Sequence, residues 1–325
     1  MTLQEIEINT TRPENLRIVS RADFDGIACA VLLRDAFQAK IPLAWERPEN
    51  IQHGTAVIQS GDILANLPFD ERALLWFDHH YTNRPKGFFR GRFEVAPSAA
   101  VVIFHHYDGH FTKDFSHFVA MADKIDSADL TLAEISEPYR FKELFLAMTV
   151  SDREKQDEPY WNHIVDLLDE MPVAEAITDR IVAERFAMVR ELQEEQRLLL
   201  KEMAYLDKTT IVCDFRKTDA FRYENRFLPY TLFPNAYANV KISHPNGNPD
   251  VTGVNAGYSI LNKNCKVNMG VLLSAFGGGG HQAAAACRFD SQYANKYIPI
   301  IIDIINKNQE LPDNFAARLK EQGVI

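Results

Sequence analysis

The segment LLWFDHHYTN, residues 74–83, runs from four apolar residues directly into an aspartate and two histidines. A short apolar run that is bounded by a polar turn predicts a buried β-strand. Such a strand normally ends in turn residues, whereas Asp78, His79 and His80 all carry side chains that bind metals. A fold that contains this segment must therefore bring partners for these side chains to the end of the strand.

Short apolar runs alternate with amphipathic segments along the first 80 residues. We expect strands at residues 16–20, 41–46, 55–61 and 72–78, and a helix at residues 26–40. Strands that are separated by helical crossovers favour a parallel sheet with helices on both faces, because parallel strands cannot be joined by a tight turn. The sequence therefore predicts an α/β fold for this part of the chain.

The pattern changes twice along the chain, which predicts three parts. Residues 1–172 form the N-terminal domain, with the parallel sheet flanked by helices. Residues 173–206 form a long amphipathic connector helix, since apolar residues recur at helical spacing and no breaker follows Pro172. Residues 207–325, where short β-like runs are broken by Pro, Gly and Asn, form a smaller C-terminal α+β domain. The connector helix either packs within the chain or pairs with a copy of itself to give a homodimer.

Charge and composition restrict the partners. The formal net charge is −10, from 35 Lys and Arg against 45 Asp and Glu, which disfavours binding of long nucleic acid but allows a small anionic ligand in a local pocket. The four cysteines form no CxxC pair, which indicates a reducing compartment. No secretory signal and no membrane-spanning segment is visible, so we expect a cytoplasmic protein that does not bind membranes.

Acidic side chains recur at the predicted strand ends. The first strand is followed by SRADFDG with Asp23 and Asp25, the third leads into QSGD with Asp62, and the fourth ends in FDHH. Parallel strands would bring these clusters to one edge of the sheet, where the carboxylates would repel one another unless divalent cations lay between them. Carboxylates with imidazole suit Mn²⁺ or Mg²⁺. Each piece alone has a simpler interpretation, a solvated turn for DFDG and a helix N-cap for Asp62.

In this order, SRADFDG, QSGD, FDHH and MADKID resemble the four motifs of the DHH phosphoesterases. FGGGGHQAAAACRF, residues 276–289, resembles the glycine-rich signature of the C-terminal domain that accompanies them. The family includes RecJ-type exonucleases, oligoribonucleases, nucleotide phosphatases and exopolyphosphatase-like proteins. The resemblance covers most of the chain, and it implies a metal-binding phosphoesterase domain followed by a substrate-binding domain.

The resemblance also implies roles for individual residues. Two ions of Mn²⁺ or Mg²⁺ would be held by five ligands, with Asp62 as the bridging carboxylate: Asp23, Asp25, Asp62, His79 and Asp123. We prefer Asp123 in the fourth motif because it follows the apolar FVAMA directly, and Asp126 is the alternative. His80 resembles the histidine that helps to hold the substrate phosphate, and we count it as a candidate catalytic residue.

One position departs from the family pattern. Many members have a histidine two residues before the first aspartate of the first motif, whereas this chain has Arg21. A guanidinium stays protonated and has no free lone pair, so it is not a normal metal ligand. Arg21 either contacts the substrate phosphate as a second candidate catalytic residue or holds Asp23 in an ion pair. Both interpretations are open.

The glycine run in the C-terminal domain is a candidate substrate-binding loop. Glycines allow backbone N–H groups to converge on an anion, and a histidine adds a donor. The candidate residues are Gly278, Gly279, Gly280 and His281. As an isolated feature, a glycine run is also typical of a flexible link.

The function that these features imply is hydrolysis of a small phosphorylated substrate by metal-activated water. Short oligonucleotides, dinucleotides and nucleotide phosphates are the expected substrates. One alternative is an exopolyphosphatase-like hydrolase of phosphoanhydrides. A second alternative is a non-catalytic, nucleotide-binding regulatory protein whose metal site is degenerate, for which Arg21 is the main sequence argument.

Overall fold

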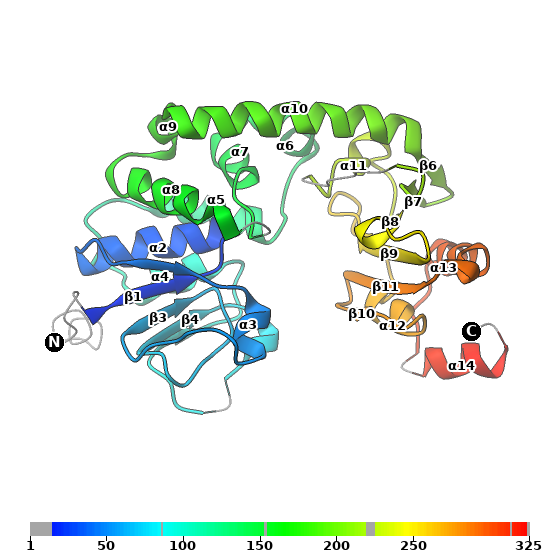
Figure 1. Ribbon diagram of the computed structural model, residues 1–325, viewed down its shortest axis with the longest axis horizontal. Coiled ribbons are helices and arrows are strands. Elements are labelled where there is room, and N and C mark those ends of the chain that lie inside the picture. Colours follow the sequence, from blue (N-terminus) through cyan, green and yellow to red (C-terminus); the bar gives the residue numbers. More distant parts are fainter. Residues whose placement is uncertain (1–14, 86, 153–154, 219–224, 313, 324–325) are drawn as a thin grey trace. The chain divides into compact units, whose positions relative to one another are not determined.

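The computed structural model describes residues 15–85, 87–152, 155–218, 225–312 and 314–323. The chain divides into two compact units (Figure 1). The first comprises Met1–Asp129 and Pro138–Val189, and the second comprises Leu130–Glu137 and Arg190–Ile325. Each unit has its own β-sheet and its own hydrophobic core.

The first unit is built on a five-stranded sheet in the order β2-β1-β3-β4-β5, and all neighbouring strands are parallel. The strands are β1 (Arg17–Ser20), β2 (Leu43–Trp45), β3 (Asp62–Ala65), β4 (Leu75–Asp78) and β5 (Gly91–Phe93). The predicted parallel sheet is confirmed. The third predicted strand is wrong, because residues 55–61 contain no strand and the strand begins at Asp62.

Helices cover both faces of this sheet. Ile18, Ile63 and Phe77 point toward α2 (Phe24–Phe37), which Figure 1 shows running across one face. Almost every residue of α2 is buried, as expected of a helix that is apolar all round. The other helices of the unit are α3 (Pro48–Gln52), α4 (Ala99–His106), α5 (Ser116–Asp126), α7 (Lys142–Met148), α8 (Glu158–Glu170) and α9 (Val173–Ala176). The strand residues next to these three, Val19, Leu64 and Trp76, point to the opposite face of the sheet. There they form a separate core with Ile51 of α3.

The predicted connector helix at 173–206 is interrupted. The structure has α9, a turn, and then α10 (Arg180–Met203), the long helix in Figure 1. Asp179 accounts for the break, because its Oδ1 accepts hydrogen bonds from the N–H groups of Ile181 and Val182 and so starts a new helix. The expected last turn of the connector is strand β6 instead. Within the described ranges, no helix has the length and apolar character needed to cross a membrane.

The second unit is an α+β unit, as predicted. Its sheet has the order β10-β11-β9-β8-β7-β6, in which only β7 and β8 are parallel neighbours. The strands are β6 (Ala204–Asp207), β7 (Thr210–Asp214), β8 (Ala238–Ser243), β9 (Val251–Tyr258), β10 (Gly279–Gly280) and β11 (Ala284–Asp290). The helices are α6 (Leu132–Ser136), α11 (Pro229–Leu232), α12 (Met269–Ser274), α13 (Ala294–Lys307) and α14 (Phe315–Glu321). Short 3₁₀ helices lie at Tyr81–Asn83, Pro138–Arg140 and Lys155–Asp157 in the first unit, and at Pro245–Gly247 and Ser291–Tyr293 in the second.

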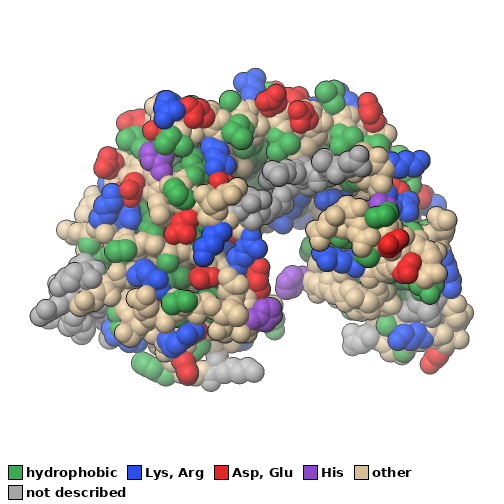
Figure 2. Space-filling model, in the orientation of Figure 1, with side chains coloured by type: hydrophobic (Ala, Val, Ile, Leu, Met, Phe, Trp, Pro, Cys, Tyr) green, Lys and Arg blue, Asp and Glu red, His purple; other side chains and the backbone are tan. Residues whose placement is uncertain are grey.

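The surface carries both signs of charge. In Figure 2, Lys and Arg side chains alternate with Asp and Glu side chains over the face in view, and neither sign forms one continuous field there. The face in view therefore lacks the continuous positive field of a groove that follows a nucleic-acid backbone.

Candidate metal centre

Polar side chains gather where three strands of the first sheet end. Asp23 and Asp25 follow β1, Asn66 follows β3, and His79 follows β4. Because β1, β3 and β4 are parallel neighbours, their carboxyl ends meet at one edge of the sheet.

Asp25 lies in the first turn of α2 and is almost completely buried. Its two carboxylate oxygens accept hydrogen bonds of 2.8 Å from the N–H groups of Ala99 and Ala100, at the start of α4. Burial and the negative charges of Asp126 and Asp23 raise the pKa of Asp25 well above its usual range. The carboxylate is therefore held in place but lacks a compensating charge.

His79 is oriented as a metal-binding histidine is. Its Nδ1 lies 2.9 Å from the carbonyl oxygen of Ala96, which can only accept, so Nδ1 carries a proton and Nε2 is the ring nitrogen left to ligate a metal. Nε2 is buried and has no hydrogen-bond partner among the described residues. It lies 3.5 Å from Oδ2 of Asp126 and 3.8 Å from Oδ2 of Asp25, and the three ligand atoms of Asp25, His79 and Asp126 all lie within 4.8 Å of one another. This donor set fits a divalent cation.

Of the two candidates in the fourth motif, the structure brings Asp126 to this cluster. Asp126 is the last residue of α5. Asp123 lies one turn earlier, and its Oδ1 accepts a hydrogen bond of 2.6 Å from the hydroxyl of Ser98, the residue that caps α4. Asp123 was preferred because it follows an apolar run directly. Distance along the sequence does not show which side of α5 faces the cluster.

Asp62 lies at the wrong end of its strand for the predicted bridging role. It is the first residue of β3 and is paired in register with Arg17, the first residue of β1. One oxygen accepts from Nε of Arg17 at 2.9 Å, and the other accepts from Nη2 of Arg17 at 2.7 Å and from the Gln59 N–H at 2.8 Å. Asn66, at the opposite edge, lies four residues further along the chain, which is about 13 Å at 3.3 Å per residue. The prediction placed Asp62 at the end of a strand at residues 55–61, whereas the observed strand begins at Asp62.

Asn66 occupies the position at the end of β3, and it is not among the residues predicted from the sequence. It has a left-handed backbone (φ 58°), and its Nδ2 donates a hydrogen bond of 2.9 Å to Oδ1 of Asp23. Its buried Oδ1 accepts no hydrogen bond within the part of the chain that the structure describes. The available signal was the short apolar run before an asparagine, a residue that tolerates this backbone conformation.

Arg21 forms the ion pair that was one of its two open interpretations. Its Nε lies 3.2 Å from Oδ2 of Asp23 and 3.3 Å from Oδ2 of Asp152. Burial alone would lower the pKa of Arg21, but the charges of Asp23 and Asp152 outweigh burial and raise it. Asp152 lies 131 residues further along the chain, outside all of the family motifs in the sequence.

His80 points to a different partner from His79. Its Nδ1 donates to Oδ1 of the fully buried Asp78 at 2.8 Å, and Asn83 donates to the other oxygen of Asp78 at 2.7 Å. Burial alone would lower the pKa of His80, but the hydrogen bond and charge of Asp78 raise it. The half-exposed ring is therefore stabilised in its charged form, which suits contact with a phosphate.

The glycine run of the second unit forms a hairpin and not an open loop. β10 pairs with β11, and the N–H groups of Gly277, Gly278 and His281 already bind the carbonyl oxygens of Ser274, Leu273 and Ala284. These three groups are therefore not available to an anion in this conformation. A side chain at Gly278 would meet the Ala286 carbonyl oxygen at 2.1 Å, so this glycine is needed for the close approach of two backbones.

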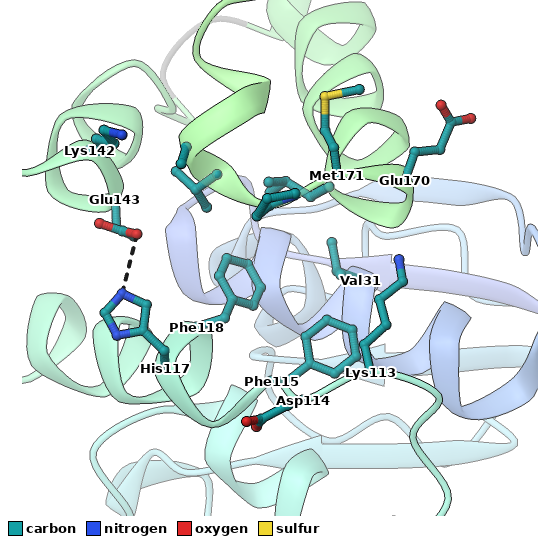
Figure 3. A pocket seen from close by; sticks show the side chains of 14 residues that line it. Val31, Lys113, Asp114, Phe115, His117, Phe118, Lys142, Glu143, Glu170 and Met171 are labelled. Atoms are coloured by element: carbon teal, nitrogen blue, oxygen red, sulfur yellow. Dashed lines mark ion pairs between the residues drawn. The ribbon is translucent and has the colours of Figure 1, made fainter.

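A separate cavity of about 540 Å³ lies among helices of the first unit (Figure 3). Apolar side chains form much of its wall: Val31, Phe115, Phe118, Leu168 and Met171. At its edge, Nε2 of His117 lies 3.4 Å from Glu143, the pair marked in Figure 3. Of the described residues that line it, none belongs to the carboxylate and imidazole cluster, so this cavity is separate from the candidate metal centre.

The arrangement predicts how Asp62→Asn behaves. We expect the free energy of unfolding to fall by about 2 kcal/mol, because the charged hydrogen bonds to Arg17 are lost, while Mn²⁺ affinity stays within about twofold of the wild type. Urea unfolding and calorimetric Mn²⁺ titration check the two parts. Loss of Mn²⁺ binding by a folded variant would restore Asp62 as a ligand.

Comparison with known proteins supports this description of the fold. No protein-family model and no curated protein matches this sequence. Among solved structures, the pGpG-specific phosphodiesterase PggH from Vibrio cholerae is similar, with a TM-score of 0.80 and 26% identity over 90% of this chain and 100% of that chain. RecJ from Thermus thermophilus in complex with Mn²⁺ has a TM-score of 0.56 and 12% identity over 99% of this chain and 58% of that chain. The DHH domain of a member of the s1p family of ribosomal proteins has a TM-score of 0.57 and 13% identity over 94% of this chain and 89% of that chain.

Proposed function

We propose that this chain, a member of the DHH family of phosphoesterases, hydrolyses the phosphodiester bond of a linear dinucleotide or another very short oligonucleotide. The observation that carries the proposal is the unpartnered Nε2 of His79 beside the carboxylates of Asp25 and Asp126. The similar protein from Vibrio cholerae is a pGpG-specific phosphodiesterase, and the similarity extends over both units of this chain. Both facts favour a small phosphorylated substrate.

The proposal includes a divalent cation, Mn²⁺ or Mg²⁺, since carboxylate and imidazole are the donors present. Asp25, His79 and Asp126 would hold it, and the free amide oxygen of Asn66 is a further donor at the same edge. A bound divalent cation lowers the pKa of water and stabilises negative charge on phosphoryl oxygens.

The chain's own residues prepare the site for this chemistry. The Ala96 carbonyl holds the His79 ring so that Nε2 faces the two carboxylates, and the start of α4 fixes Asp25. His80, held by Asp78, presents its other ring nitrogen as a donor for a phosphoryl oxygen. In this proposal His80 therefore positions the substrate, and no side-chain nucleophile is required.

The experiment compares substrates of increasing length on the purified full chain. Each substrate is incubated with Mn²⁺, with Mg²⁺ and with a chelator. The substrates are linear diguanylate and diadenylate with a 5′-phosphate, a pentanucleotide, a twenty-residue single strand and polyphosphate. We expect mononucleotides from the dinucleotides, at a rate about tenfold or more above that for the long strand, and no product with the chelator. Product separation by ion-exchange chromatography measures this.

Other outcomes identify the alternatives. Phosphate release from polyphosphate alone would establish a phosphoanhydride hydrolase. Tight binding of dinucleotide without turnover under every metal condition would establish a non-catalytic binding protein. Either result rejects the proposed activity.

A further inference from the structure

The carboxylates at the metal-binding edge fall into two groups with different surroundings. Asp25 and Asp126 lie beside Nε2 of His79. Asp23 and Asp152 share the guanidinium of Arg21, whose Nε lies 3.2 Å from one carboxylate and 3.3 Å from the other. Asp25 and Asp126 could therefore bind a cation from solution, whereas Asp23 and Asp152 already pair with a cationic side chain of the protein, Arg21.

We propose that Arg21 takes the place of a second metal ion, so that the site binds one divalent cation, held by Asp25, His79 and Asp126. The inference rests on the proposed function, because it concerns the same site. It differs from the expectation of two ions that the sequence motifs imply.

The contacts of Asp23 support this assignment. Its Oδ1 accepts hydrogen bonds of 2.9 Å from the Gly26 N–H and from Nδ2 of Asn66, and its Oδ2 faces Arg21. A divalent cation bound to Oδ2 would lie next to a guanidinium that stays charged at every working pH. The repulsion between these like charges disfavours a second ion at this place.

The amide side chain of Asn66 also favours a single ion. An amide supplies a neutral oxygen, whereas a bridging carboxylate would supply the negative charge that stabilises two adjacent cations. Arg21 and one divalent cation together carry three positive charges against the carboxylates of Asp23, Asp25, Asp126 and Asp152. Asp78 is matched separately by His80 and Asn83. With one ion the sum is one negative charge, and a second ion would leave one net positive charge beside the guanidinium.

Metal stoichiometry tests the inference without any measurement of activity. The full chain is freed of metal and titrated with Mn²⁺, and bound Mn²⁺ is counted by calorimetry and by electron paramagnetic resonance. We expect one tightly bound Mn²⁺ per wild-type chain, with the six-line spectrum of an isolated ion. We expect Arg21→His to bind a second Mn²⁺ at least about tenfold more tightly than the wild type does, because the charge is removed and an imidazole ligand is added.

Arg72→His is the matched control, since Arg72 pairs with Asp70 and lies near Asp62, which is at the opposite edge of the sheet. It is expected to bind one Mn²⁺. Two Mn²⁺ ions of similar affinity in the wild-type chain, or a folded Arg21→His variant that gains none, would overturn the inference and leave the hydrolase intact. A wild-type chain that binds no Mn²⁺ would reject the proposed function as well. If Arg21→His does not fold, the wild-type stoichiometry still decides between one ion and two.

Discussion

Asp126→Asn is expected to weaken Mn²⁺ binding by about 100-fold or more and to reduce dinucleotide hydrolysis to a similar degree. The substitution removes a charged oxygen that lies 3.5 Å from Nε2 of His79, and loss of even an indirect partner of a metal ligand costs about 10- to 100-fold in affinity. The metal-free protein should not lose stability, because the charge of Asp126 raises the pKa of the buried Asp25 carboxyl and its removal relieves that repulsion. Calorimetric titration and thermal unfolding measure the two effects.

Asp123→Asn is the control for this prediction, since the residue lies one turn earlier on the same helix. Its amide oxygen can still accept the hydrogen bond from Ser98, so Mn²⁺ affinity is expected to change less than about threefold. The reverse result, with binding lost in Asp123→Asn and kept in Asp126→Asn, would show that the sequence-based preference was right and the assignment to Asp126 wrong.

Gly26→Ala is expected to lower the free energy of unfolding by about 3 kcal/mol or more and to abolish tight Mn²⁺ binding. A Cβ at Gly26 would lie 1.8 Å from the backbone oxygen of Arg21, and a backbone atom cannot move aside as the end of a flexible side chain can. The first turn of α2 would have to shift, and Asp25 lies in that turn. Chemical unfolding and Mn²⁺ titration of the same preparation measure both losses.

Gly87→Ala is the matched control, because a Cβ there meets nothing within 4 Å. Its stability and Mn²⁺ affinity are expected to equal those of the wild type within error. If Gly26→Ala were as stable as Gly87→Ala and bound Mn²⁺ normally, the close approach between α2 and the Arg21 turn would not be required for the site.

Local sequence patterns were sufficient to predict the elements that depend only on residues adjacent in the chain. The run into FDHH ends strand β4, and the DFDG turn leads from β1 into α2. In both cases the apolar pattern that predicts the strand end and the polar residues that follow it lie in one short segment. The same segment therefore predicts both the strand and the side chains at its end. The parallel α/β architecture followed from the alternation of these elements.

The same reasoning failed where two interpretations fit the same residues. The apolar pattern predicts a strand at residues 55–61 with Asp62 at its end, and a helix N-cap is the alternative for Asp62, whereas the structure begins β3 at Asp62 and ends it before Asn66. A shift of β3 by four residues along the sequence moves Asp62 from one edge of the sheet to the other. No local preference distinguishes these alternatives, because the register of β3 is set by its hydrogen bonds to β1 and β4.

The sequence by itself determined the kinds of donor that this protein brings to its sheet and the parallel architecture that collects them, because both depend on residues that are close together in the chain. Only the tertiary structure decided which donors share one edge. Register moved Asp62 away and put Asn66 in its place, the rotation of α5 selected Asp126, and a contact across 131 residues gave Arg21 its second partner in Asp152. These outcomes depend on packing between distant segments, and local sequence carries no record of that packing.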